Sequence, residues 1–443
     1  MNQTLFFAKL GTSLQKHGYE IAYVSFHEKS LQYLEHEGFM AFNAFNPKAN
    51  YIEQINLETY SWVSLNLTLS HEREAFEVSN STKLITKLKS YLAVIEEAFD
   101  VLLSRYNRVS LIQELGGFLS IVSAHYAARR RSLDSYFLEP SFFKGRFIIQ
   151  KNSLMASQIT EESQEPLLPE VSKYLKDVES QQSIVIPSKD RNHYRKPIYK
   201  LTDSRNWQRL IQKSIDRYVL GHQEEFSYIG GHVGRHLRMW LNAQRLATDY
   251  QQIPDNFPFV YYPFHVPADV ALTLRSPEYL DQYALIDYLA RSIPNHCQLV
   301  IKEHPALVGG IHYKRLRGLL NKYDNLVLLN PGINNYEILK CSAAVVTVNS
   351  KSGAEALLLG KPVIVLGNAF YTESDLVIKP TQLSDLPILL AKAVSEPPLL
   401  DSDKIKRYFQ SVWSASYSGE IYSLDSKNIM DIVTALMSEI KLL

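Results

Sequence analysis

The stretch Ala343–Tyr371, AAVVTVNSKSGAEALLLGKPVIVLGNAFY, decides the fold of this chain. It opens with an unbroken apolar run rich in β-branched residues and continues into a polar turn, the pattern of a parallel strand buried on both faces. Ser352, followed three residues later by Glu355, fits a capping box, so a helix is predicted to begin near Gly353. Gly360 is placed to end that helix, and a second apolar run follows. The stretch therefore predicts a strand, a polar turn, a short helix and another strand.

The polar turn is the chemical part of this stretch. Asn349, Ser350 and Ser352 place an amide and two hydroxyls beside the free N–H groups of a helix N-terminus, which attracts anions and phosphate above all. The alternative is that Ser352 only caps the helix and binds nothing. A second motif, QLVIKEHP at residues 298–305, is a strand that ends in polar residues. Because ligands bind at the carboxyl ends of strands in an open α/β sheet, both polar segments are expected at one edge.

Composition limits the class of protein. The 443 residues allow two or three domains, and 46% hydrophobic with 21% charged residues is typical of a soluble globular protein. The net charge of +1 gives no reason to expect nucleic acid as a partner. Only two cysteines are present, and we find no signal peptide and no apolar run of about 18 residues. We therefore expect a cytoplasmic protein without a disulfide, a zinc site or a membrane span.

Two motifs together resemble a known family. IKEHP at residues 301–305 and VNSKSGAEALLLGKPVIVLGNAFY at residues 348–371, in this order and spacing, resemble the capsule-polysaccharide synthesis family of glycosyltransferases. The resemblance is strongest over residues 258–372 and weaker in the N-terminal half. The best understood members are retaining β-Kdo transferases that use CMP-Kdo. The resemblance implies an α/β, GT-B-like fold, in which two Rossmann-like domains face a central cleft.

The predicted domains follow from this resemblance and from the pattern of the chain. Residues 1–255 are expected to form an acceptor-binding Rossmann-like domain, with a basic helical insertion around 204–250. Residues 256–400 are expected to form the Rossmann-like domain that binds the nucleotide sugar. The helices of residues 401–443 are expected to cross back to the first domain.

The first domain supplies four candidate residues. A short strand ending at Phe7 is predicted to lead into a helix, and its turn would place Lys9, Gly11 and Thr12 where an acceptor could bind. A plain surface turn is the alternative for each of them. Glu139 lies at the end of another predicted strand, before an aromatic loop that contains glycine. The resemblance implies that Glu139 is the acid/base, and the alternative is a solvated glutamate in a turn.

Asp269 is the candidate nucleophile of the second domain. It follows a predicted strand at residues 259–265, and the resemblance implies that it attacks the anomeric carbon. The alternative, an N-cap of the predicted helix at residues 279–293, is set aside because ten residues separate the two. His265 stands where the family usually has glutamine, which affects contacts with the donor carboxylate.

The remaining donor-binding candidates surround the predicted anion site. His304 can donate to the single phosphate of a CMP-sugar, and Lys302 adds positive charge. Glu355 lies in the first helical turn, where an acidic residue holds ribose in many glycosyltransferases; closing the capping box is its alternative role. The full set of donor-binding candidates is His265, Lys302, His304, Pro305, Asn349, Ser350, Ser352, Gly353 and Glu355.

Three functions compete at this point. The first is a retaining β-Kdo transferase of bacterial capsule or O-antigen synthesis, which forms a covalent adduct on Asp269 while Glu139 transfers the proton. The second is another nucleotide-dependent transferase, with CMP-sialic acid, a UDP-sugar or CDP-glycerol as donor. The third is a non-catalytic module that binds glycans or nucleotides.

The first of these functions fixes the expected partners. They are a nucleotide-sugar donor and a saccharide or glycolipid acceptor, with no nucleic acid. A CMP leaving group carries one phosphate and no DxD-like motif is evident, so neither a metal nor another cofactor is expected. The basic insertion suggests peripheral contact with the cytoplasmic face of the inner membrane or with a glycan-assembly complex. A solvated helical insertion is the alternative.

Overall fold

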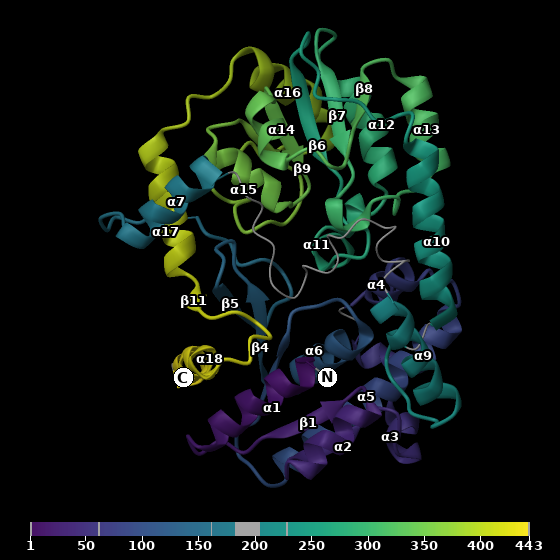
Figure 1. Ribbon diagram of the computed structural model, residues 1–443. Coiled ribbons are helices and arrows are strands. Elements are labelled where there is room, and N and C mark those ends of the chain that lie inside the picture. The colour runs from purple at the N-terminus through teal and green to yellow at the C-terminus, as the bar shows by residue number, and fades with distance from the viewer. Residues whose placement is uncertain (1, 61–62, 161, 182–203, 227–228, 442–443) are drawn as a thin grey trace.

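Figure 1 shows a computed structural model of the chain, which forms two domains, one above the other in this view. The structure describes residues 2–60, 63–160, 162–181, 204–226 and 229–441. The upper domain contains the C-terminal sheet, and the lower domain contains most of the N-terminal half. Both domains combine strands with helices, which confirms the predicted α/β, GT-B-like fold class with its Rossmann-like domains.

The C-terminal domain is built on one five-stranded parallel sheet with the order β10-β9-β6-β7-β8. Read from β8 to β10, the strands follow the chain order 3-2-1-4-5, the order of a Rossmann half, which reverses between β6 and β9. The strands are buried because helices cover both faces of the sheet. They are β6 (Phe259–Pro263), β7 (Gln298–Lys302), β8 (Leu326–Leu329), β9 (Ala344–Thr347) and β10 (Val363–Val365).

The helices of this domain follow its strands in turn. They are α11 (Val270–Thr273), η3 (Pro277–Tyr279), α12 (Gln282–Ser292), η4 (Pro305–Leu307), α13 (Tyr313–Lys322), α14 (Asn335–Cys341), α15 (Lys351–Leu358), η5 (Leu383–Asp385) and α16 (Leu386–Ser395). The predicted strand, turn, helix and strand of the opening stretch are confirmed as β9, α15 and β10.

The N-terminal domain contains two smaller sheets. In one, β1 (Ala22–Ser25) pairs in parallel with β2 (Met40–Asn43). In the other, β3 (Ser110–Glu114) pairs in parallel with β4 (Asp134–Pro140), and β5 (Arg146–Lys151) and β11 (Tyr417–Ser418) continue it antiparallel. The helices are α1 (Asn2–Gln15), α2 (Glu28–His36), α3 (Ala49–Gln54), η1 (Leu57–Tyr60), α4 (Leu65–Phe76), α5 (Ser81–Leu103) and α6 (Leu119–Arg130).

The predicted strand at the N-terminus is wrong. Residues 2–15 form the single helix α1, so the strand-to-helix turn that would have presented acceptor-binding residues does not exist. Phe6, Leu10 and Leu14 recur at every fourth position and pack against α18 (Ser426–Lys441), the last helix of the chain. The short apolar run was compatible with a strand, because the local sequence does not show that its packing partner is a helix at the other end of the chain.

The helical insertion consists of α9 (Ser204–Tyr218) and α10 (Ile229–Leu246), and α10 runs beside both domains (Figure 1). Near the middle of α10, Arg238 forms an ion pair with Glu77, which follows α4. Nearer its upper end the Asn242 side chain donates to the carbonyls of Gly309 and Ile311, both at 3.2 Å. Helix α10 therefore contacts both domains, and a basic side chain takes part on the N-terminal side.

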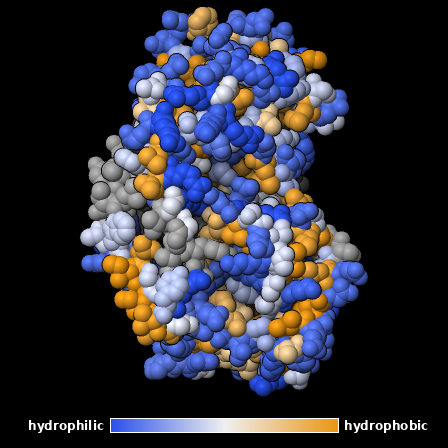
Figure 2. Space-filling model, turned by 90° about the vertical axis from the view of Figure 1, so that its right-hand side faces the viewer, coloured by the Kyte–Doolittle hydropathy of each residue, from blue (hydrophilic) through white to orange (hydrophobic). Residues whose placement is uncertain are grey.

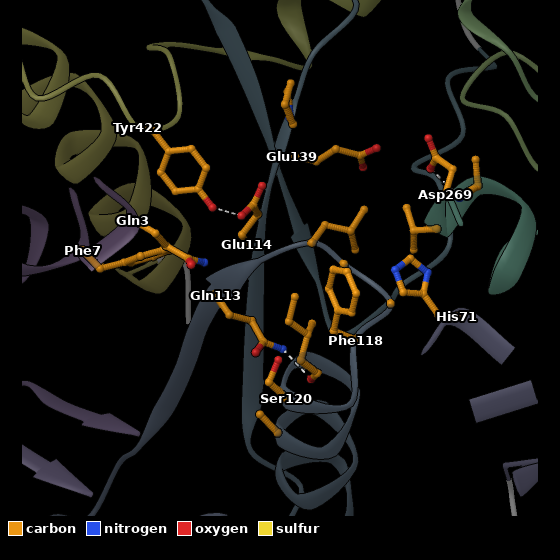
Figure 3. A pocket seen from close by; sticks show the side chains of 18 of the residues that line it. Gln3, Phe7, His71, Gln113, Glu114, Phe118, Ser120, Glu139, Asp269 and Tyr422 are labelled. Atoms are coloured by element: carbon orange, nitrogen blue, oxygen red, sulfur yellow. Dashed lines mark hydrogen bonds between the residues drawn. The ribbon is translucent and has the colours of Figure 1, made fainter. Parts of the chain in front are cut away.

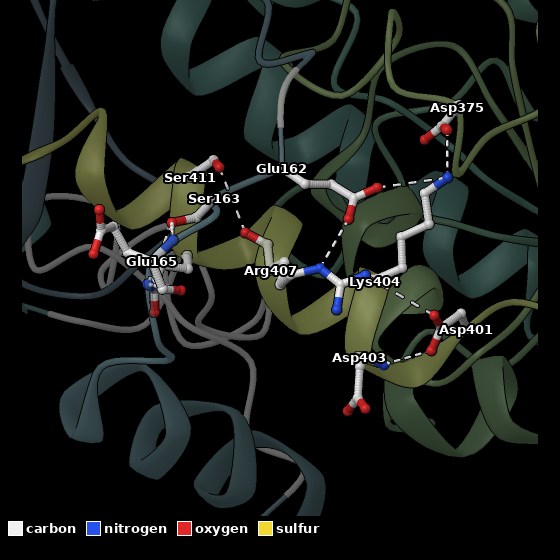
Figure 4. Close-up of polar contacts among 10 residues, drawn as sticks. Glu162, Ser163, Glu165, Asp375, Asp401, Asp403, Lys404, Arg407 and Ser411 are labelled. Atoms are coloured by element: carbon white, nitrogen blue, oxygen red, sulfur yellow. Dashed lines mark hydrogen bonds and ion pairs between the residues drawn. The ribbon is translucent and has the colours of Figure 1, made fainter.

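The C-terminal segment returns to earlier parts of the chain. On α17 (Ser402–Ser414), Arg407 Nε donates to Glu162 at 3.0 Å, and Lys404 Nζ lies 3.5 Å from the same carboxylate and also pairs with Asp375 (Figure 4). Helix α17 packs against α7 (Pro169–Gln181), and α18 packs on α1.

The domain boundaries drawn at residues 255 and 400 stay predictions. Within the described residues, no helix combines the length and apolar character needed to cross a bilayer.

Candidate active site

A cleft of about 2450 Å³ separates the two domains and brings most of the predicted site residues together. Those that line it are Gly11, Glu139, His265, Asp269, Lys302, His304, Pro305, Asn349, Ser350, Ser352 and Glu355. The cleft lies at the carboxyl ends of β6 and β9, where the strand order reverses and where ligands bind in open α/β sheets. Figure 3 shows Glu139 and Asp269 entering the same space from β4 and from the start of α11.

Lys9 and Thr12 lie away from the residues that line the cleft. The Lys9 amine donates to the Leu424 carbonyl at 3.1 Å, and the Thr12 hydroxyl donates to the Ala8 carbonyl of its own helix at 3.0 Å. Gly11 is buried in α1, and a Cβ there would stand 2.0 Å from the Tyr23 hydroxyl. Close packing against Tyr23 accounts for this glycine without an acceptor.

Asp269 is exposed and also caps a helix. Its Oδ1 accepts from the Ala271 N–H at 2.9 Å, at the start of the four-residue helix α11. The expectation that the next helix lies ten residues away is wrong, because α11 begins directly after Asp269. A four-residue helix is too short to leave a periodic pattern in the sequence. The cap fixes the orientation of a carboxylate that faces the cleft.

Glu139 is held by an arginine that the sequence analysis did not consider. Arg275 follows α11 in the C-terminal domain, and its Nη1 and Nη2 donate to the two carboxylate oxygens of Glu139 at 2.9 and 2.7 Å. Its Nε donates to the Leu154 carbonyl at 2.9 Å, and Arg275 is only 9% exposed. The expected alternative of a solvated glutamate is wrong, because this carboxylate is one half of a bidentate ion pair between the domains.

His304 presents an N–H donor at the predicted anion site. Its Nδ1 accepts from the Ala306 N–H at 3.2 Å, so in the neutral ring the proton resides on Nε2. Burial lowers the pKa of His304 to about 4, although the charge of Asp269 acts in the opposite direction. Lys302 is buried beside it, its pKa lowered to about 8 by burial, and its amine donates to the Ile333 carbonyl at 2.8 Å.

The predicted capping box is wrong in its residues. Ser350 is the N-cap of α15 and accepts from the Ser352 N–H at 3.1 Å. The Asn335 side chain of α14 instead donates to Ser352 Oγ at 3.1 Å and to Glu355 Oε2 at 2.8 Å. Ser352 and Glu355 do have the required spacing, but the actual cap, Ser350, lies two residues before the predicted one. Burial raises the pKa of Glu355 to about 7.

Asn349 and His265 connect the turn after β9 to the rest of the site. The Asn349 amide donates to the Ala271 carbonyl at 2.6 Å and to Ser276 Oγ at 3.0 Å, which holds α11 against the anion site. His265 Nε2 accepts from the Val348 N–H at 3.3 Å. Burial lowers the pKa of His265 to about 4, so the ring is neutral at the end of β6. Both side chains position the strand ends around the cleft.

His71 is a cleft residue that the sequence analysis missed. It comes from α4 of the N-terminal domain, and its Nδ1 lies 2.8 Å from Thr273 Oγ1 at the end of α11. Burial lowers its pKa to about 4, and the charge of Asp269 acts in the opposite direction. A lone histidine on an amphipathic helix carries no signal in the sequence that would have identified it.

Gly353 lies in the first turn of α15, where close packing leaves no room for a side chain. A Cβ at this position would stand 2.2 Å from the hydroxyl of the buried Tyr371, which donates to the Ser350 carbonyl. We expect Gly353→Ala to lower the free energy of unfolding by about 1–3 kcal/mol, measured by urea denaturation, because the ring must shift in a packed core.

The matched control for this variant is Gly318→Ala in α13, where an added Cβ meets nothing within 4 Å. That change is expected to raise stability by about 0.5–1 kcal/mol, because alanine favours a helix more than glycine does. Equal effects of the two alanines would contradict the packing role of Gly353.

Comparison with known proteins identifies the family. A family model described as "Capsule polysaccharide biosynthesis protein" matches residues 122–378, more than half of the chain. The chain belongs to this family. The predicted resemblance to capsule-polysaccharide synthesis proteins is thereby confirmed at the level of the family.

Individual relatives match over part of their length. The chain is 33% identical over 186 residues to Protein FixF of Sinorhizobium fredii and 28% identical over 185 residues to the capsule polysaccharide export protein KpsS of Escherichia coli. These matches cover 41% of this chain in both cases and 42% and 38% of the relatives, so the chain spans about two-fifths of the curated relatives that it matches.

Among the solved structures that the chain matches is the β-Kdo 2,7 transferase of Thermosulfurimonas dismutans KpsC. It is 15% identical, with a TM-score of 0.38, and the match covers 79% of this chain and 89% of that one. The β-Kdo 2,4 transferase of the same KpsC gives 13% identity and a TM-score of 0.35, covering 77% of this chain and 94% of that one.

Proposed function

We propose that the chain is a retaining β-Kdo glycosyltransferase that transfers Kdo from CMP-Kdo to a saccharide acceptor in bacterial surface-polysaccharide synthesis. The observation that carries the proposal is the position of Asp269. Its exposed carboxylate lines the same cleft as His304 and the N-terminus of α15, at the point where the strand order reverses. Membership in the capsule polysaccharide biosynthesis family supports a role in glycan assembly.

The donor would bind through its single phosphate. The neutral His304 ring offers an Nε2–H donor, and Ser350 with the first N–H groups of α15 offers a helix N-terminus that favours an anion. Glu355 lies one turn into the helix and faces the cleft, where it can accept from a ribose hydroxyl. One phosphate is compensated by these neutral and dipolar groups, so neither a metal nor another cofactor is part of the proposal.

The proposed reaction has two displacement steps. A carboxylate oxygen of Asp269 attacks the anomeric carbon, the bond from that carbon to the phosphate oxygen breaks, and CMP leaves with the electron pair. The acceptor hydroxyl then attacks the same carbon and displaces Asp269 as a carboxylate. Each displacement inverts the anomeric centre, so the product retains the configuration of the donor.

We place the reaction at the cytoplasmic face of the inner membrane, with a saccharide or glycolipid as acceptor. Helix α9 exposes four large apolar side chains, whose exposed fractions lie between 40% and 72%. The helix lies on the side of the molecule that Figure 2 shows, and the larger hydrophobic groups of that side are on its lower half. The four side chains are Trp207, Ile211, Ile215 and Tyr218. An apolar helix face of this kind suits peripheral contact with a membrane or with a glycan-assembly complex.

Two other functions remain as alternatives. A neutral histidine and a helix N-terminus also suit CMP-sialic acid, a UDP-sugar or CDP-glycerol, because they recognise phosphate and not the sugar. A non-catalytic glycan- or nucleotide-binding module would keep the anion site but would not depend on Asp269.

A donor panel tests the proposal. The purified chain is mixed with CMP-Kdo generated in situ and a panel of synthetic acceptors, and the release of CMP and the product mass are followed. We expect CMP release with a product heavier by one Kdo residue. Intact CMP-Kdo with consumption of another donor would favour the second function, and CMP binding without turnover of any donor would favour the third.

A further inference from the structure

The acceptor step of the proposed reaction needs a base, and Glu139 is poorly placed to be that base in this structure. As the acceptor oxygen attacks the adduct, its proton must move to a nearby group. Both oxygens of Glu139 already accept from Arg275, at 2.9 and 2.7 Å. The acceptor hydroxyl could reach either oxygen only after displacing the guanidinium of Arg275.

His71 is fixed in the cleft by its surroundings. Its ring packs edge-on against Phe118, with 4.5 Å between the ring centroids and an interplanar angle of 88°. Gly117 leaves room for it, since a Cβ there would stand 2.3 Å from His71 Nδ1. Figure 3 shows His71 between Phe118 and Asp269 at the wall of the pocket. The contacts with Phe118 and Gly117 restrict rotation of the ring, so the same edge of His71 faces the cleft.

Two hydrogen bonds assign the tautomer of His71. The Thr273 hydroxyl donates to the Asp269 carbonyl at 2.9 Å, and a carbonyl can only accept. Thr273 Oγ1 is therefore left to accept from His71 Nδ1, 2.8 Å away, and the Nδ1 atom carries the proton. In the neutral ring Nε2 then has a lone pair. Among the residues that the structure describes, Nε2 has no hydrogen-bond partner, and His71 lines the cleft.

We propose that His71 Nε2 is the general base that takes the proton from the acceptor hydroxyl. This inference rests on the proposed function. The acceptor oxygen forms its bond to the anomeric carbon, the bond from that carbon to Asp269 breaks, and its electron pair returns to the Asp269 carboxylate. The hydroxyl proton moves to Nε2, so an imidazolium and a carboxylate form together.

The neighbourhood of Asp269 suits this proton transfer. Its negative charge favours the protonated form of His71: burial lowers the pKa of the ring, and the charge of Asp269 raises it. In the adduct that charge is absent, and His71 stays neutral and ready to accept a proton. When Asp269 leaves, the charge returns and stabilises the imidazolium at the moment it forms.

The test compares His71→Asn with wild type in the full chain, using in situ CMP-Kdo and the acceptor that wild type accepts. Asparagine keeps an N–H donor near the position of Nδ1 and removes the base at Nε2. Product formation is expected to fall by about 10²–10⁴-fold. Intact mass measurement is expected to show the Kdo adduct accumulating, because the first displacement does not use Nε2, and added imidazole is expected to restore part of the rate.

The matched control is His125→Asn in α6. His125 is also buried in the N-terminal domain, burial likewise lowers its pKa to about 4, and it is not among the residues that line the cleft. This variant is expected to keep the wild-type transfer rate. His71→Gln, which also lacks a basic nitrogen, replaces His71→Asn if the latter does not fold.

The outcomes distinguish a failure of the role of His71 from a failure of the proposed function. Unchanged transfer by His71→Asn, or slow transfer without accumulated adduct, would overturn the role of His71 while the transferase remains. If wild type itself consumes no CMP-Kdo and forms no adduct, the proposed function fails and the role of His71 fails with it.

Discussion

Asp269→Asn is expected to lower the rate of sugar transfer by at least about 10³-fold, because an amide cannot replace a carboxylate nucleophile. The fold should remain intact. Asparagine caps helices as well as aspartate does, so the bond from the Ala271 N–H can be kept. CMP release and product mass measure the rate, and a thermal melt measures the stability of the variant.

The control for this prediction is Asp281→Asn. Asp281 is the N-cap of α12, where its Oδ1 accepts from the Ala284 N–H at 3.2 Å, and it does not line the cleft. The same chemical change there is expected to leave the transfer rate as in wild type. If Asp269→Asn transfers Kdo as fast as Asp281→Asn, the carboxylate is a helix cap and not the nucleophile.

The sequence predicts the C-terminal domain well for a physical reason. Parallel strands covered on both faces are short, apolar and continuous, and glycine, proline and polar residues mark where they end. The strands β6, β7 and β9 could therefore be found, and with them the polar residues at their ends. The fold then brings Asp269, His304 and Ser350 to one cleft, since carboxyl ends of parallel strands meet at one edge.

What the sequence could not predict are contacts between distant segments. Arg275 and Glu139 are 136 residues apart, and His71 lies 202 residues from Thr273. No local pattern records such pairs. The same limit explains the error at the N-terminus, where the apolar face of α1 is matched by α18 at the other end of the chain. The positions of candidate residues at strand ends predicted which of them line one cleft, but not the partners that orient them.

Arg275→Met is expected to lower the free energy of unfolding by about 2–4 kcal/mol, because it leaves the Glu139 carboxylate without its partner. Breaking a fully buried ion pair costs about 3–5 kcal/mol. We expect a smaller loss here because the Glu139 side chain is 21% exposed and water can reach it. The bond from Arg275 Nε to the Leu154 carbonyl is lost as well. Urea denaturation with linear extrapolation measures the change.

Arg291→Met is the control, since Arg291 is 57% exposed and pairs with Asp287 at 2.9 Å on the surface. Its loss is expected to cost less than about 1 kcal/mol. Equal destabilisation by the two changes would show that the Arg275 pair does not hold the domains together.

Combining Arg275→Met with Glu139→Gln closes a double-mutant cycle, which isolates the energy of the pair from the effects of each residue alone. The cycle also bears on the chemistry of Glu139. If Glu139 acts only by holding Arg275, Glu139→Gln lowers stability and transfer together, and the variant with both changes transfers no more slowly than Arg275→Met. If Glu139 also moves a proton once substrate displaces Arg275, adding Glu139→Gln to Arg275→Met slows transfer further without further loss of stability.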